Sequence, residues 1–100
     1  MKVHTEAVHF SADIKLIEFV EKKLTKLDQY FDRIQEARVS LKLENSGQVK
    51  DKKVEIRLIV PGDTLVAKDT EKTFEAAIDK ITDVLKRQII RYKDRNRETV

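Results

Sequence analysis

The spacing of the apolar residues changes twice along this 100-residue chain, from a helical period to a strand period and back. Steps of three and four predict an amphipathic helix over residues 12–33 and a second one, roughly 25 residues long, near the end of the chain. The stripe of the first helix comprises Ile14, Ile17, Val20, Leu24, Leu27 and Phe31. The stripe of the second comprises Phe74, Ala77, Ile78, Ile81, Leu85, Ile89 and Tyr92.

Between the two helices the apolar residues alternate with polar ones, which predicts β-strands. Residues 45–48 indicate a turn or loose loop, and Pro61 with Gly62 fits the centre of a type II turn. The predicted strands cover residues 3–9, 39–43, 54–58 and 65–67. The order β-α-β-β-β-α therefore predicts an α+β fold, with one four-stranded sheet and two parallel helices packed on one of its faces.

The helix ends and the packing of the helices follow from local chemistry and from chain topology. Ser11 is a plausible N-cap of the first helix, with Asp13 in the first turn, and Thr70 or Thr73 can cap the second. A right-handed crossover from the first strand to the second, with strands in consecutive order, makes the helices parallel neighbours.

Several classes of protein are excluded or disfavoured by what the sequence lacks. There is no cysteine, and no apolar run approaches the roughly 20 residues of a membrane span. The only histidines are His4 and His9, and the two glycines, Gly47 and Gly62, form no phosphate-binding loop. We therefore expect a single cytoplasmic domain at residues 1–100 that is monomeric when free, with no catalytic residues, metal, cofactor, small-molecule substrate or membrane partner.

Charge is split lengthwise along the first helix. Between residues 13 and 33 there are five basic and five acidic residues, so this segment is neutral in total. At about 100° per residue the two signs fall on opposite flanks of the apolar stripe. The basic flank comprises Lys22, Lys23, Lys26, Tyr30 and Arg33. The acidic flank comprises Glu18, Glu21, Asp28 and Asp32, and the wheel angles predict that it faces Lys80, Arg87 and Arg91 of the second helix.

The end of the second helix concentrates the basic charge of the protein. Residues 84–97 hold six Lys and Arg against the single acid Asp94, in a chain with a net charge of +3. This excess is more than favourable interaction with the helix dipole requires, and it favours a polyanion partner. The cations are Lys86, Arg87, Arg91, Lys93, Arg95 and Arg97. Tyr30 and Tyr92 can each stack on a nucleotide, although core packing is the simpler interpretation of Tyr92.

Four segments in register resemble the bacterial ribosome hibernation-promoting factors, also called ribosome-associated inhibitors or sigma-54 modulation proteins. They are KLDQYFDRI at 26–34, VEIRL at 54–58, AAIDK at 76–80 and LKRQI at 85–89, the last followed by Arg91 and Lys93. The resemblance covers nearly the whole chain and implies the same β-α-β-β-β-α fold. The chain resembles the short form of the family, without the separate C-terminal domain through which long forms dimerise ribosomes.

The resemblance implies a stress-response protein that occupies the small ribosomal subunit, where mRNA and tRNA anticodon arms bind. It would contact rRNA through the basic residues and Tyr30 listed above and would inhibit translation reversibly. Two other functions remain open. One is a protein-interaction module that modulates a sigma factor or another transcription factor, as the older family name suggests. The weaker one is a double-stranded-RNA-binding domain, whose α-β-β-β-α core is similar.

Overall fold

The elements follow one another in the predicted order in this computed structural model, which describes residues 1–44 and 52–98. The strands are β1 (Lys2–Val8), β2 (Glu36–Leu43), β3 (Lys52–Val60) and β4 (Asp63–Glu71). The helices are α1 (Ile14–Thr25), the short 3₁₀ helix η1 (Lys26–Gln29) directly after it, and α2 (Phe74–Glu98). The turn predicted at 45–48 lies outside the described residues.

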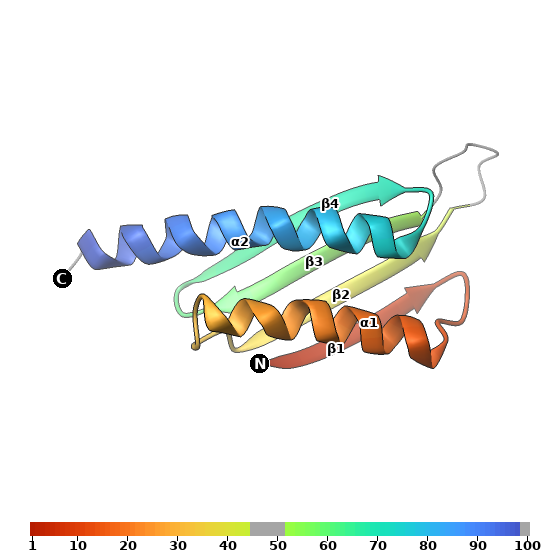
Figure 1. Cartoon of the computed structure of the whole chain (residues 1–100), viewed down its shortest axis with the longest axis horizontal. Helices are drawn as coiled ribbons and strands as arrows, with labels where there is room; N and C mark the ends of the chain where they lie inside the picture. Colours follow the sequence, from red (N-terminus) through yellow and green to blue (C-terminus); the bar gives the residue numbers. More distant parts are fainter. Residues whose placement is uncertain (45–51, 99–100) are drawn as a thin grey trace.

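The four strands form one sheet in the order β1-β2-β3-β4. β1 runs parallel to β2, and the other neighbouring strands are antiparallel. Both helices lie side by side on one face of the sheet and run in the same direction, while the other face is open (Figure 1). These features confirm the predicted α+β architecture. The C-terminal turns of α2 extend beyond the sheet, as Figure 1 also shows.

The core lies between the two helices and the inward-facing side chains of the sheet. All seven residues of the predicted α2 stripe are buried, and Leu24 of α1 is completely so. Ile14 contradicts the prediction, because its side chain is 71% exposed. It is the first residue of α1, and the core near this end is covered by Phe10, whose ring stacks on Phe74 with the centroids 4.9 Å apart.

The first helix is shorter than the predicted 12–33. The α-helical part ends at Thr25, whose hydroxyl donates to the Lys22 carbonyl 3.2 Å away, and the chain tightens into η1. This tighter turn still buries Leu27. Steps of three suit a 3₁₀ helix as well as an α-helix, so the apolar pattern did not reveal the change.

The N-cap predicted for the first helix is wrong, and one of the two candidates for the N-cap of the second helix is confirmed. The N-cap of α1 is Asp13, not Ser11, because the Asp13 carboxylate accepts a 2.8 Å hydrogen bond from the Leu16 amide. At α2 the cap is Thr73, whose hydroxyl accepts from the Ala76 amide at 3.1 Å. Thr70 lies inside β4, which is longer than the predicted 65–67. In both caps the side chain satisfies an amide that has no partner within the helix.

Removing the Asp13 cap is expected to destabilise the protein by about 1 kcal/mol, because an amide at the start of α1 loses its acceptor. The test is urea unfolding of Asp13→Ala beside Ser11→Ala. The exposed Ser11 is not the cap, so its truncation should change the unfolding free energy by less than about 0.5 kcal/mol. Equal losses in the two variants would contradict the assignment of the cap.

The hairpin between β3 and β4 has the predicted two-residue turn. Gly62 has φ +78°, the left-handed region that glycine adopts without strain. β4 lies at the edge of the sheet, and α2 packs along it. The Gln88 side-chain amide donates to the Val66 main-chain carbonyl oxygen at 3.0 Å, which fixes the helix on this edge strand.

Candidate nucleic-acid interface

The basic flank of α1 faces α2, which is the reverse of the predicted arrangement. Lys23 Nζ lies 2.9 Å from Asp79 Oδ1 of α2. The Lys86 ammonium lies over the ring of Tyr30, 5.0 Å from its centroid. The acidic flank points the other way, since Asp28 Oδ2 lies 3.6 Å from the amino group of Met1 in front of β1. The basic side chains of the two helices therefore gather along the line where α1 meets α2, which we call the basic seam.

Two of the three α2 cations that were predicted to meet the acidic flank have local partners instead. Lys80 pairs with Glu71 at the end of β4, 2.8 Å away, and the hydrogen bond with this carboxylate raises the pKa of Lys80. Arg87 pairs with Asp83 one turn earlier at 3.3 Å. Such exposed ion pairs contribute little to stability, so a polyanion can displace them at small cost.

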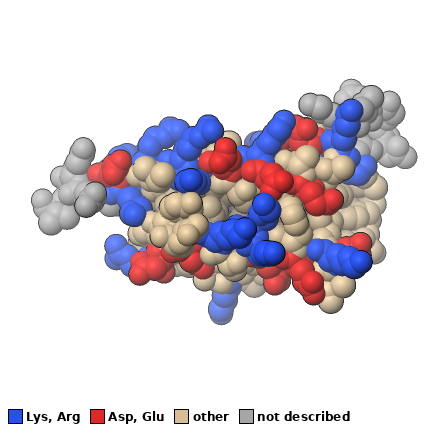
Figure 2. Space-filling view, in the orientation of Figure 1, with Lys and Arg blue, Asp and Glu red and all other residues tan. Residues whose placement is uncertain are grey.

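Six predicted cations are free of ion pairs within the described side chains, at 1–44 and 52–95. Two of them, Arg33 and Lys86, lie over aromatic rings. The other four are exposed, and they are Lys22, Lys26, Arg91 and Lys93. Lys93 lies two turns after Lys86, on the α2 face that meets α1. In Figure 2, blue side chains lie over the region between the helices and over the C-terminal half of α2, with red ones interspersed. The seam is therefore basic without being uniformly so.

The remaining predicted residues surround this seam. The Arg33 guanidinium lies 5.6 Å from the ring centroid of Phe31, and that ring packs edge-on against Tyr92. Tyr92 is buried, with its hydroxyl donating to the Pro61 carbonyl, so it belongs to the core and is not available for stacking. Tyr30 is only half-buried. The side chain of Arg97 lies outside the described part of the chain.

Arg91 and Arg95 lie on a different side of α2 from Lys86. Together with Leu65, Val84 and Gln88 they line a groove of about 490 Å³ beside β4. Arg95 Nη2 also lies 3.6 Å from Asp63 Oδ2 at the start of that strand. The predicted set of cations is thus divided between the seam and the outer side of α2.

Two features of the seam were not predicted. Asp79 lies against Lys23 and neutralises its charge. No role in the site was predicted for Asp79, which stands in the AAIDK segment at 76–80. Ile90 is 43% exposed and follows Lys86 by one turn, which places an apolar surface beside the cations. Ile90 is apolar but does not belong to the predicted apolar stripe of α2, and this could have indicated an exposed apolar side chain. No group of three or more potential metal ligands occurs in the described residues, nor does a helix long and apolar enough to cross a membrane.

Comparison with known proteins agrees with this architecture. Residues 3–97 match the family model described as sigma 54 modulation protein / S30EA ribosomal protein. The chain belongs to this family. A ribosome hibernation promotion factor of Deinococcus radiodurans is 42% identical over 78% of the chain, which spans 41% of that protein's length. A ribosome hibernation promoting factor of Pseudomonas putida is 33% identical over 95% of the chain and 89% of its own length.

A solved structure extends the likeness to three dimensions. The N-terminal domain of Thermus thermophilus Protein Y superposes with a TM-score of 0.80 at 29% identity, over 92% of this chain and 99% of that domain. That domain shares the sheet and both helices, so the basic seam lies on a frame common to the two proteins. The expected resemblance to hibernation factors is thereby confirmed at the level of the family.

Proposed function

We propose that this protein is a ribosome hibernation factor that binds the small ribosomal subunit in the channel for mRNA and tRNA. The observation that carries the proposal is the basic seam between α1 and α2, in a chain whose relatives are named ribosome hibernation factors. Bound there, the protein would contact rRNA and block translation by occupying the channel. Its place of action would be the cytoplasm, under conditions of stress.

The seam suits rRNA because its groups match the two parts of a nucleotide. Lysine and arginine side chains neutralise phosphates, and arginine can grip a phosphate with two parallel hydrogen bonds. Tyr30 can stack on an unpaired base if the Lys86 ammonium moves from its ring to a neighbouring phosphate. The proposed contacts come from Lys22, Lys23, Lys26, Tyr30, Arg33, Lys86, Arg87, Arg91, Lys93, Arg95 and Arg97.

Inhibition of this kind is reversible, because it needs occupancy and no covalent step. Phosphate contacts release counterions, so the affinity falls as the salt concentration rises. Ligands of the same channel would compete with the protein. Reversibility distinguishes a blocking protein from an enzyme that modifies the ribosome, because a covalent modification would persist after the enzyme dissociates.

Initiator tRNA together with mRNA is expected to displace the protein from small subunits. The measurement is co-sedimentation of the purified protein with isolated small subunits at fixed salt, with and without increasing amounts of both RNAs. The pelleted fraction should fall as the RNAs are raised. A fraction that stays constant while the RNAs bind would contradict occupancy of the channel.

The family description also mentions modulation of sigma 54, which keeps a second function in view. A protein-interaction module of that kind would bind a sigma factor and would itself stay in the supernatant when small subunits are pelleted. The same sedimentation experiment therefore separates the two functions, with a sigma factor added in place of the RNAs. We favour the ribosome, because a basic seam suits RNA better than it suits a protein surface of mixed charge.

A further inference from the structure

The sheet face opposite the helices carries a row of basic side chains across three strands. His4 of β1 lies directly opposite Arg38 of β2, and Arg38 lies opposite Arg57 of β3. Their side chains are 62%, 65% and 56% exposed. All three line one shallow depression of about 310 Å³. None of these residues belongs to the helix seam.

Each arginine of this row is oriented by a glutamate of its own strand. Arg38 Nε donates to Glu36 Oε1 at 2.9 Å, and Arg57 Nε donates to Glu55 Oε1 at 3.0 Å. The hydrogen bond from Arg38 lowers the pKa of Glu36, so this carboxylate stays charged. Both bonds use Nε, and the terminal nitrogens have no other partner among the described residues. Two pre-oriented guanidinium groups thus present their outer edges to solvent.

The arginine pair has no structural purpose that a neutral pair would not serve better. Like charges at directly opposite positions destabilise a sheet. The flanking glutamates offset part of this repulsion, but each of them binds the inner nitrogen of its arginine. An oxyanion between the two outer edges would accept hydrogen bonds from both guanidinium groups, which is the arrangement that phosphates favour.

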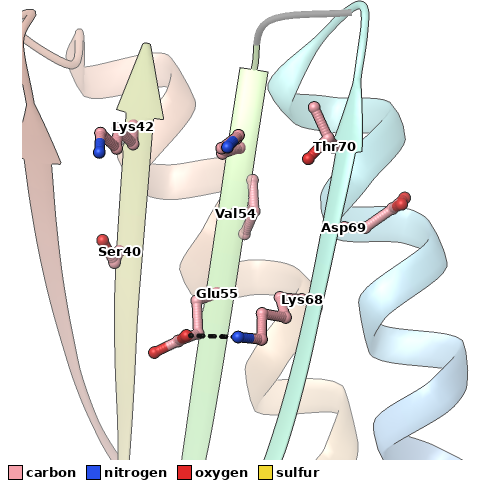
Figure 3. Close-up of a pocket in the computed structure, with 8 residues that line it drawn as sticks. Ser40, Lys42, Val54, Glu55, Lys68, Asp69 and Thr70 are labelled. Atoms are coloured by element: carbon pink, nitrogen blue, oxygen red, sulfur yellow. Dashed lines mark ion pairs between the residues drawn. The ribbon is translucent and has the colours of Figure 1, made fainter. Parts of the chain in front are cut away.

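A second basic pair lies four residues further along the same two strands. Lys42 of β2 is opposite Lys53 of β3, about 13 Å from the arginine pair at the usual rise per residue. With Lys68 of β4 these residues line a hollow of about 600 Å³ on the face turned away from the helices (Figure 3). Lys68 Nζ is 3.9 Å from Glu55 Oε2. The outward positions of the four strands hold no Phe, Tyr or Trp and only the single imidazole of His4, so this face suits phosphates better than stacked bases.

We propose that the open face of the sheet is a second RNA-binding surface, on which Arg38 and Arg57 together grip one backbone phosphate of rRNA. Lys42 and Lys53 would hold another phosphate of the same strand, in place of the partly exposed Glu44 carboxylate that lies 3.5 Å and 3.0 Å from them. The inference rests on the proposed function, because a protein in an RNA-lined channel meets RNA on two sides. The protein spans only 18 Å along its shortest axis, so the seam and the open face lie on opposite sides of a thin molecule. The protein then acts as a spacer between two rRNA segments.

The double variant Arg38→Gln/Arg57→Gln tests the proposal. Its affinity for isolated small subunits should fall about tenfold, since the loss of one charge-assisted contact is of that order. Arg38→Lys/Arg57→Lys keeps the charge but not the fork, and it should fall between the double Gln variant and the wild type. The matched control is Lys72→Glu, which lowers the net charge by the same two units at an exposed residue between β4 and α2 that belongs to neither surface. Thermal unfolding checks that all variants fold.

Each outcome of the comparison has a distinct meaning. An Arg38→Gln/Arg57→Gln protein that binds as tightly as the Lys72→Glu protein would overturn the second surface. If Lys86→Gln/Lys93→Gln, a variant of the seam, lost binding in the same assay, the proposed function would stand. Seam variants that bind normally would reject the proposed function itself.

Protein-free small-subunit rRNA is the second probe. If the arginine variant binds this RNA normally but binds subunits poorly, the occupant is an acidic protein, and the RNA proposal is wrong.

Discussion

Exchange of Lys86, Arg87, Arg91 and Lys93 together for Gln is expected to lower the affinity for small ribosomal subunits at least about a hundredfold. These side chains lie off the apolar stripe of α2, so the fold should persist. The interactions lost within the protein are small, because the ion pair of Arg87 with Asp83 is exposed on both sides. Co-sedimentation measures the affinity, and circular dichroism with thermal unfolding checks the fold.

The fourfold variant can be separated into two double variants. Lys86→Gln/Lys93→Gln removes two cations from the seam. Arg87→Gln/Arg91→Gln removes two cations from the solvent-facing and outer sides of α2. We expect the seam half to lose more affinity, because Lys86 adjoins the basic flank of α1. The Lys72→Glu protein again controls for net charge. If this control lost as much affinity as the seam half, overall charge and not the seam would govern binding.

Truncation of the core should have the largest effect on stability. Leu24→Ala and Ile81→Ala each remove most of a fully buried side chain, at the centre of the helix–sheet contact. The expected cost is about 2–5 kcal/mol, a large share of the roughly 5–15 kcal/mol that holds a small domain folded. Urea unfolding monitored by circular dichroism measures the change.

Ile14→Ala is a matched control for Leu24→Ala, because both residues lie on the predicted stripe of the first helix. Ile14 is 71% exposed, and its truncation should change stability by no more than about 0.5 kcal/mol. A large loss from Ile14→Ala, or none from Leu24→Ala, would show that the inward face of α1 is wrongly assigned.

The architecture could be predicted because burial imposes a period on the sequence. Val54, Ile56 and Leu58 alternate in β3 since only one face of the sheet is covered. The whole stripe of α2 was found for the same reason. These signals extend over many residues, so one exception such as Ile14 does not obscure them.

Helix ends depend on single atoms and were harder to predict. Ser11 and Asp13 are both good N-caps by residue type. The choice between them depends on where the chain leaves β1, at Val8, and on His9, whose φ of +70° turns the chain. That left-handed backbone is rare outside glycine, so the residue sequence gave no sign of it.

The charge pattern located the basic side chains but not their neighbours. A helical wheel shows that the basic and acidic flanks are on opposite sides of the helix. Which flank meets the adjacent helix depends on the direction in which the helix is rotated about its axis relative to the sheet. The contact of Lys23 with Asp79 shows that the predicted direction was wrong. Arg38 and Arg57 were missed for another reason. Their alternation with apolar residues marked them only as the solvent side of two strands, although Glu-x-Arg recurs in both.

The hydrogen bond from Gln88 to Val66 has a consequence for the behaviour of the protein in a crowded cell. β4 ends the sheet, and an edge strand of nine residues is a template on which another chain can add. Gln88 occupies one carbonyl of this strand, and α2 packs along it with Arg91 and Arg95 beside the groove. Approach of a second sheet would have to displace an amide and bury two cations. The β4 edge of the sheet is in this way protected against pairing with a strand of another molecule.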